Sequence, residues 1–537
     1  MPTRQATPQW RFWSVFAALS LLSLIASVDI SIVTTALPTI TRAIGGERQY
    51  VWIANSYPLA STVPQPLYAQ ISNLIGRRNP VLFAVSLFAV GSGIAGGATN
   101  TAMLIVGRVV QGLGTGGIYV LSAIIVSDLV PLRQRSQYVS VMFLTAAVGG
   151  AIGPLVGGAF AERDWRWIFY LNVPASGVSL VVMFIALKEK SRAVATNDAS
   201  IRGVLVRVDL LGSVIFIPSV LAILLGLVLG GVDYPWSSYH IIVPLVIGFV
   251  GWGSFHVYQT FCKEPSVPNH LFKNRTTVVA FGMGFIAFML TQVASYFLPV
   301  YFMTVAGASP VRAGVDCLLY SVMVPVSAVG AGAFVARSGR YRPLFWGGFA
   351  LQAVGYGLLS TLGGIYSQAR SYAYEFLVAI GTGLVIPAIS SALMAPLPES
   401  DVACVNGVYS FLRSFAFVWG VTISSIVFNS QFDTHGSQIQ DDTVRTKFAD
   451  GAAYTSASGG FIAGLPQSTR KKVIAVYMDA LGTVWQVAIA LSCVGFLLGL
   501  VAKHVPLREE LHTEYGLEES TNTGDCEQLE RETAESK

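Results

Sequence analysis

The sequence contains few charged residues. Of its 537 residues only 12% are Asp, Glu, Lys or Arg, whereas roughly a quarter is usual in a soluble domain, and 53% are hydrophobic. Apolar runs long enough to cross a hydrocarbon core of about 30 Å recur along the chain. Because a helix satisfies its own backbone hydrogen bonds in lipid, we predict an all-α protein that spans the membrane many times.

Motifs of several function classes are also missing. The chain has no G-x-x-x-x-G-K-[ST] loop, so a pump driven by nucleotide hydrolysis is not indicated. The five cysteines stand singly, without CxxC or metal-ligand spacing, and no His, Asp or Cys cluster indicates a metal site. The net charge of +5 is spread over loops, which argues against nucleic acid as a partner. We therefore predict neither an enzyme nor a bound cofactor.

Hydropathy predicts fourteen membrane spans. The first run begins near Trp13 without a short h-region or a cleavage site, so we expect it to remain as a span. Lysines and arginines gather in alternate loops, which assigns those loops and both termini to the cytoplasm. The spans are expected near 13–37, 50–72, 80–98, 102–125, 138–160, 167–187, 209–230, 239–261, 277–302, 312–336, 343–362, 371–394, 404–428 and 480–502.

Internal repeats divide these spans into two sets. The segment AQISNLIGRRNPV at 69–81 has a partner in GAFVARSGRYRPL at 332–344, and in each a helix is expected to end at Gly before an arginine cluster. The string GTG occurs at 114–116 and again at 381–383, and in that register Arg108 corresponds to Glu375. Duplicated halves are typical of secondary transporters, whose substrate site lies near the membrane midplane between the halves.

The repeats and loops together predict the domain organisation. We expect a cytoplasmic N-terminus at 1–12, a six-helix bundle at 13–187, a cytoplasmic linker at 188–208, two inserted helices at 209–261, a second six-helix bundle at 277–502 with an external loop at 429–479, and a disordered cytoplasmic tail at 503–537.

Ionisable residues inside the predicted spans are candidates for proton coupling. A carboxylate such as Asp29 costs about 2.5–3.5 kcal/mol within a bilayer, so it must be paired, protonated or in contact with a wet cavity. Asp29 and Arg108 fall at similar depths, and we predict that they pair and that protonation of Asp29 releases Arg108. Alternatively, Asp29 is a static partner for a nearby cation, or Glu375 or another acid serves Arg108.

Two further charges lie in the second half. Glu375 is a third candidate for proton coupling, although its position in the first turns of a span also fits a side chain that reaches the external interface. Arg413 lies about nine residues into the span at 404–428.

Small residues recur at one-turn intervals in the fifth span, in GGAIGPLVGG. They line one helix face and allow a neighbouring helix to come into backbone contact, while a proline removes one helix hydrogen bond beside that face. Simple helix packing explains such a pattern when it occurs alone. The fixed positions of the pattern are Gly149, Gly153, Pro154, Gly157 and Gly158.

This string resembles the antiporter motif of exporters in the major facilitator superfamily. The segment around Asp29 is similar to the first-helix motif of the fourteen-span drug:proton antiporter family, with Ser31 in place of the usual Thr. The stretch around Arg108 and the segment DWRWIFYLNVP at 164–174 also resemble motifs of that family, although an aromatic belt explains the second equally well. The repeat spacing and the long external loop most resemble fungal efflux pumps of toxin and secondary-metabolite pathways.

The segment at 69–78 resembles the cytoplasmic gate motif of the superfamily, at Gly76, Arg77 and Arg78. Asn73 replaces the acid that the family uses there to pair across the gate, so we predict no charge-based lock at that point. Orientation of the loop in the membrane is the alternative explanation for the two arginines.

The resemblance implies a proton-coupled secondary transporter that exports a small hydrophobic or amphipathic compound. Proton-coupled uptake of a small organic solute, such as a siderophore, is the alternative. We expect a monomer in the lipid bilayer of the plasma membrane, or of a vacuole or vesicle, driven by the proton gradient. The candidate cavity residues are Gln111, Tyr296, Phe297 and Tyr301, although such aromatic spacing also fits ordinary helix packing.

Overall fold

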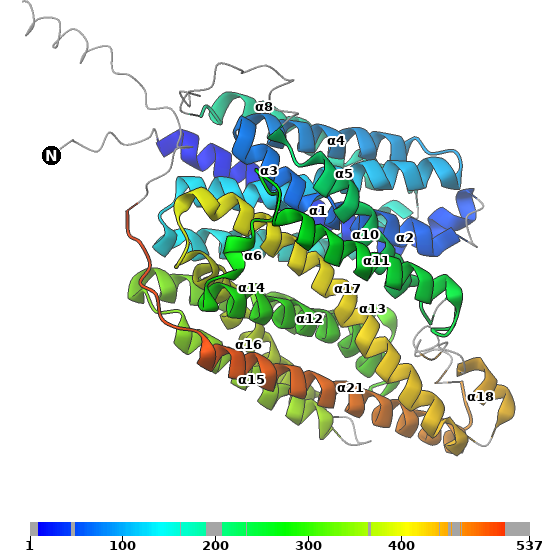
Figure 1. The fold of residues 1–537 in the computed structure, drawn as a ribbon. Helices are drawn as coiled ribbons and strands as arrows, with labels where there is room; N and C mark the ends of the chain where they lie inside the picture. The colour runs from blue at the N-terminus through cyan, green and yellow to red at the C-terminus, as the bar shows by residue number, and fades with distance from the viewer. Residues whose placement is uncertain are drawn as a thin grey trace, which may run out of the picture.

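The computed structural model describes residues 9–44, 49–161, 163–189, 207–231, 233–362, 367–439, 441–448, 453, 462 and 464–510. Within these ranges the chain is almost wholly helical, and its long helices run side by side (Figure 1). Twelve described helical segments are long and apolar enough to cross a membrane. The predicted all-α membrane architecture is therefore confirmed.

The first half of the molecule comprises eight helices, in the order α1 (Gln9–Ile44), α2 (Tyr50–Thr62), α3 (Gln65–Ile75), α4 (Arg78–Gly96), α5 (Thr101–Leu129), α6 (Leu132–Ala161), α7 (Trp167–Tyr170) and α8 (Asn172–Ala186). The predicted span at 50–72 falls on α2 and α3. The chain breaks there because Pro64 and Pro66 have no N–H to continue the helical ladder.

An inserted pair follows, formed by α10 (Leu210–Leu229) and α11 (Tyr239–Gln259). The second half then contains η2 (Asn269–Phe272), α12 (Arg275–Thr304), α13 (Pro310–Asp316), α14 (Leu318–Ser338), α15 (Arg342–Ser360), α16 (Gln368–Met394), η3 (Glu399–Asp401), α17 (Val402–His435), η4 (Gly436–Gln438), α18 (Asp442–Phe448) and α21 (Gln467–Val501).

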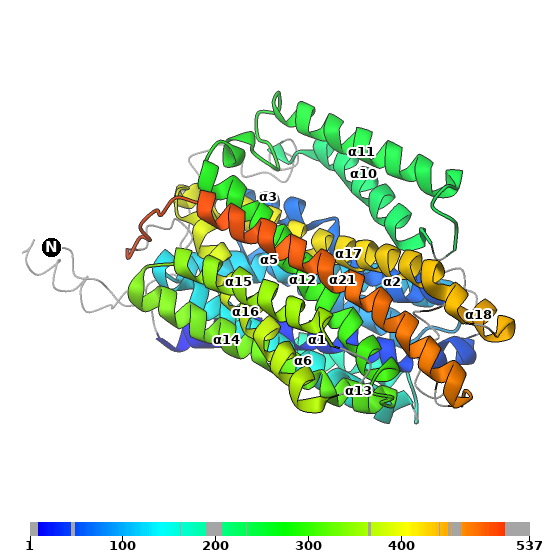
Figure 2. The same cartoon turned by 90° about the horizontal axis from the view of Figure 1, so that it is seen from below.

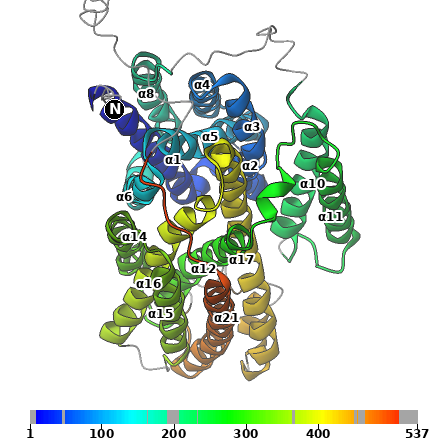
Figure 3. The ribbon, with the colours of Figure 1, turned by 60° about the vertical axis from the view of Figure 1, so that its left-hand side comes forward.

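The two halves lie on opposite sides of the molecule, and the inserted pair lies along one flank (Figures 2 and 3). Within the first half α1 packs on α6 and α4 on α5, while in the second half α14 and α15 both pack on α16. The halves meet where α6 contacts α14 and where α3 contacts α17. The predicted count of fourteen spans stays a prediction, since neither the segment at 50–72 nor α15 is among the twelve candidate spans.

The repeated segments fold alike. Gly76 ends α3 with φ +89°, and Gly339 ends α14 with φ +68°. Gly339 has the left-handed helical conformation and Gly76 has a positive φ with an extended ψ of 179°, and glycine adopts both without steric cost. The two predicted helix ends before arginines are therefore present in the described chain.

The helices around the predicted external loop extend farther than hydropathy indicated. α17 continues to His435 and α21 begins at Gln467, whereas the loop was predicted over 429–479. The reason is that Tyr477 packs against Phe432 and Phe448, so the added turns bury an apolar face although their other face is polar. Most of the predicted linker at 188–208, residues 1–8 and the tail from 511 lie outside the described residues.

Candidate functional site

A buried ion pair joins α1 to α5. Arg108 Nη1 lies 2.5 Å from Asp29 Oδ2, and the two side chains are 2% and 0% exposed. The structure thus places together the two residues that the sequence suggested as a pair. Because both charges are removed from solvent, each depends on the other and on further hydrogen bonds for its stability.

Two amides complete the surroundings of the carboxylate. Gln111 Nε2 donates to Asp29 Oδ1 at 2.7 Å, and Asn172 Nδ2 of α8 donates to the same oxygen at 2.7 Å. Gln111 also accepts a hydrogen bond from Arg108 Nη1 at 2.9 Å and donates to Ser92 Oγ of α4 at 2.9 Å. Asp29 therefore receives three hydrogen bonds, from three different side chains.

Aromatic rings hold the guanidinium of Arg108. Its Cζ atom lies 4.2 Å from the centroid of Tyr57 on α2 and 5.8 Å from that of Phe169 on α7. Thr115 Oγ1 donates to the Tyr57 hydroxyl at 2.8 Å. Arg108 and Thr115 are seven residues apart on α5 and share one helix face, which explains how one tyrosine meets both. This cluster, called the Asp29 network below, connects α1, α2, α4, α5, α7 and α8.

Glu375 is the candidate proton-coupling acid of the second half. It is fully buried on α16 and accepts a hydrogen bond from the backbone N–H of Tyr320 on α14 at 3.0 Å. Its Oε2 atom has no hydrogen-bond partner, and no ion pair involves it among the described residues. Glu375 therefore neither serves Arg108 nor reaches an interface, because it is enclosed within the other half of the molecule.

The small-residue face of α6 packs directly on α1. A Cβ atom at Gly149 would lie 2.4 Å from the carbonyl oxygen of Leu24, and one at Gly153 would lie 2.5 Å from Cβ of Ser31. Only glycine fits at such distances. Pro154 lies inside the same helix, as do Gly157 and Gly158. Leu24 lies five residues before Asp29 and Ser31 lies two residues after it, so α1 and α6 approach each other closely on both sides of Asp29.

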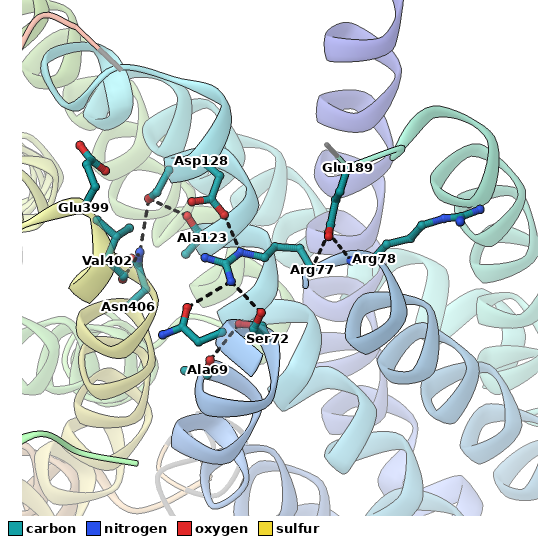
Figure 4. Close-up of polar contacts among 12 residues, drawn as sticks. Ala69, Ser72, Arg77, Arg78, Ala123, Asp128, Glu189, Glu399, Val402 and Asn406 are labelled. Atoms are coloured by element: carbon teal, nitrogen blue, oxygen red, sulfur yellow. Dashed lines mark hydrogen bonds and ion pairs between the residues drawn. The ribbon is translucent and has the colours of Figure 1, made fainter. Parts of the chain in front are cut away.

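The arginine-rich end of the molecule, where α3, α5 and α14 end, holds a second polar cluster (Figure 4). Arg77 Nε donates to Asp128 Oδ2 of α5 at 2.7 Å, and Arg77 Nη1 donates to the carbonyl oxygen of Ser72 at 2.6 Å and to Asn73 Oδ1 at 3.1 Å. The absence of a charge-based lock at Asn73 stays a prediction. Asn73 carries no charge, and the acid that pairs with Arg77 is Asp128, from another helix of the same half.

Glu189 caps the start of α4 at the same end. Its Oε1 atom accepts the backbone N–H groups of Arg77 at 2.5 Å and Arg78 at 2.6 Å. Burial raises the pKa of the Glu189 carboxyl above its usual value, while the two backbone hydrogen bonds act in the opposite direction. A Cβ atom on Gly76 would collide with this carboxylate, which is a second reason for glycine at that turn.

Contacts between the halves gather at the arginine-rich end. Arg135 Nη2 of α6 donates to Glu399 Oε2 of η3 at 2.7 Å, and Arg133 Nε donates to the carbonyl oxygen of Ala336 at 2.8 Å. The described cluster thus holds the two halves together on the side that the positive-inside rule assigns to the cytoplasm. Sequence reasoning missed Asp128, Arg135 and Glu399 as partners, because all three lie outside the predicted spans, where charged residues are common.

The four candidate cavity residues have different surroundings. Gln111 is fully buried in the Asp29 network, and Phe297 is fully buried against Phe428. Tyr301 is 3% exposed, and its hydroxyl lies 3.1 Å from Ser371 Oγ. Tyr296 keeps 39% of its surface exposed. In this conformation only Tyr296 presents a substantial surface to a solute, because packing between helices covers the other three.

An apolar cavity of about 340 Å³ lies between the inserted pair and α17, beside their direct contacts. Its walls include Phe216 of α10, Trp252 and His256 of α11, and Phe411 of α17. His256 is the one titratable side chain of this lining, and it stands among aromatic rings.

The family model and the relatives described here all belong to one family. The family model described as Major Facilitator Superfamily matches residues 19–421. The MFS efflux transporter aclA of Aspergillus oryzae is 47% identical over 526 residues, which cover 97% of this chain and 95% of that protein. The MFS-type efflux pump LUC4 of a Fusarium species is 43% identical over 95% of this chain and 90% of its own. The efflux pump FUS6 of Gibberella moniliformis is 41% identical over 95% and 91%.

Solved structures share the fold at low sequence identity. The human organic anion transporter MFSD10 superposes with a TM-score of 0.58 at 15% identity, over 92% of this chain and all of that one. The proton:xylose symporter XylE superposes with a TM-score of 0.55 at 15% identity, over 90% of this chain and 95% of that one. At such identities the similarity concerns the arrangement of the helices.

Proposed function

The chain belongs to the major facilitator superfamily, and from this premise we propose that it exports a small amphipathic compound, of the drug, toxin or secondary-metabolite class, in exchange for protons. The observation that carries the proposal is the near full-length similarity, at 41–47% identity, to proteins named as efflux transporters or efflux pumps. Export across the plasma membrane is the direction we assign, with a vacuolar or vesicular membrane as the alternative.

Alternating access supplies the mechanism. The two halves rock about a central site, so that the solute faces one side of the membrane and then the other. In the conformation described here, Arg135 and Glu399 join the halves at the arginine-rich end. We propose that these contacts break when the solute is taken up from the cytoplasm and form again when it is released outside.

The buried acids supply the coupling to protons. Asp29 is held as a carboxylate by Arg108, Gln111 and Asn172, whereas Glu375 has no cation beside it in the described structure. Because an unpaired carboxylate is costly away from water, the neutral acid is the form that the surroundings of Glu375 favour. We therefore assign the proton to Glu375 in this conformation, and to Asp29 in the state in which Arg108 has been released.

Efflux from intact cells tests the proposed direction. Yeast cells that express the protein are loaded with fluorescein through its diacetate ester, and the fluorescence that remains is followed over time. Export predicts faster loss than in cells with an empty vector, and collapse of the proton gradient with a protonophore should remove the difference. Greater retention in the expressing cells would instead support proton-coupled uptake.

Asp29→Asn tests the coupling. The amide keeps the shape of the side chain but leaves Arg108 without its counter-charge, so we expect folded protein of lower stability. At matched amounts of folded protein in proteoliposomes, gradient-driven fluorescein transport should be lost. Glu264→Gln is the matched control, because Glu264 pairs with Arg207 at a partly exposed site outside the candidate spans. Wild-type rates for Asp29→Asn would contradict the assigned role.

A further inference from the structure

Arg413 is a cation near the middle of the membrane that lacks an acidic partner. It lies eleven residues after Val402, the first residue of α17, which places it roughly 17 Å along that helix. In contrast, three buried arginines of the described chain each pair with an acid, Arg77 with Asp128, Arg108 with Asp29 and Arg135 with Glu399. No ion pair or hydrogen bond involves the guanidinium of Arg413 among the described residues.

The surroundings of Arg413 are aromatic and come from both halves. Its Cζ atom lies 5.0 Å from the ring centroid of Tyr119 on α5 and 6.0 Å from that of Phe143 on α6. Tyr409 lies one turn earlier on α17, and its buried hydroxyl has no hydrogen-bond partner in the described structure. Arg413, Tyr119 and Phe143 are only partly buried, so each keeps surface that a solute could contact.

These observations describe an incomplete site. A guanidinium in the membrane interior is costly unless an anion neutralises it, and its planar fork matches the two oxygens of a carboxylate. The two aromatic rings beside it provide an apolar surface on which a ring can stack. Because the rings belong to the first half and the arginine to the second, a solute bound here would contact both halves at once.

We propose that Arg413 binds the carboxylate of the transported compound, and that Tyr119 and Phe143 stack on a planar conjugated part of the same molecule. This inference rests on the proposed function and narrows it from amphipathic compounds to planar organic acids. Cation–π contact with Tyr119 offsets only part of the desolvation cost of Arg413, which leaves the rest for the solute to offset.

A pair of probes that differ only in charge tests the inference. Binding of 2-naphthoate and of neutral 2-naphthamide is measured by equilibrium dialysis on the purified full-length protein in detergent. We expect the wild type to bind 2-naphthoate about tenfold more tightly than the amide, and Arg413→Gln to lose that preference with less than a twofold change for the amide. Tyr119→Leu should weaken both probes to a similar extent, because it removes stacking and leaves the charge.

Two further variants complete the test. Arg370→Gln removes one exposed positive charge elsewhere in the second half and should preserve the tenfold preference. Arg413→Lys keeps the charge without the fork, so it should retain a preference of about threefold, and it decides the matter if Arg413→Gln does not fold. Equal binding of the two probes by the wild type, or an unchanged preference in both Arg413 variants, overturns the inference. Because dialysis needs no proton gradient, a failure of export in cells would leave this readout unaffected.

Discussion

In the first half Arg108 meets an acid and a tyrosine ring, whereas the matching position of the second half holds an acid that meets only a tyrosine backbone. The internal repeat relates Arg108 to Glu375 (375 minus 108 is 267) and Tyr57 to Tyr320 (320 minus 57 is 263). Tyr57 contacts Arg108 through its ring, and Tyr320 contacts Glu375 through its N–H. The two helix pairs therefore bring the same positions together in both halves.

The helix that corresponds to α1 extends the comparison. α12 packs on α17 as α1 packs on α6, and it contains no Asp or Glu, so the second half has no acid on the helix where the first half has Asp29. At these corresponding positions the first half thus holds two opposite charges that neutralise each other, and the second half holds one acid without a counter-charge beside it. A duplicated fold has kept the packing while changing the charges, so one half contains a neutralised ion pair and the other contains the acid to which we assign the exchanged proton.

The largest effect should come from breaking the pair of the first half. Arg108→Met removes the cation and leaves Asp29 buried and unpaired, so we expect a loss of about 3–5 kcal/mol in the free energy of unfolding. The measurement is thermal unfolding in detergent, followed by size-exclusion chromatography. The double variant Asp29→Asn, Arg108→Met should recover much of that loss, because it leaves no uncompensated charge. A single and a double variant of equal stability would show that the pair does not hold the first half together.

The second effect concerns transport rather than stability. Glu375→Gln removes no ion pair, so its unfolding temperature should stay within a few degrees of the wild type. Gradient-driven transport in proteoliposomes should fall at least tenfold, since the amide cannot exchange a proton. Arg108→Met is measured in the same preparations, and its unfolding temperature should fall further than that of Glu375→Gln. Normal coupling in Glu375→Gln would remove the proposed difference between the halves.

Sequence reasoning identified the central pair of the Asp29 network because charged residues are rare in the predicted spans. Few charges occur in the predicted spans, and counting residues along two helices placed Asp29 and Arg108 at similar depth. It did not find Asn172, because a single amide at a helix start is common and only packing brought that one to α1. Asp128 was missed for a related reason, since its partner Arg77 comes from a segment 51 residues earlier in the chain.

The aromatic residues show which features of a site a single sequence does not predict. In a helix that is apolar on all sides, periodicity does not distinguish faces that pack on other helices from faces that line a cavity. Phe297 and Tyr301 therefore fitted a cavity from their spacing alone, and the structure buries both. Arg413 was recorded by its depth, but its lack of an acid became apparent only once the partners of the other arginines were known.

The smallest effect tests the packing that the halves share. Gly153 of α6 and Gly420 of α17 are 267 residues apart, and a Cβ atom at Gly420 would lie 2.6 Å from the carbonyl oxygen of Met289 on α12. The two glycines thus lie in equivalent helix contacts. Gly153 lies where α6 packs on α1, and Gly420 lies where α17 packs on α12. Gly153→Ala and Gly420→Ala should each cost about 1–3 kcal/mol, because the added methyl group forces the two helices apart.

Gly177→Ala is the control for this pair, since a Cβ atom there has no neighbour within 4 Å and the change should leave stability unaltered or slightly improved. Thermal unfolding of the three variants measures the costs side by side. Similar losses at 153 and 420 mean that backbone packing is a property of the repeat, on which the different charges of the halves are superimposed. A loss at only one of them would mean that the halves differ in packing as well as in charge, and the asymmetry between Asp29 and Glu375 would then follow from the packing.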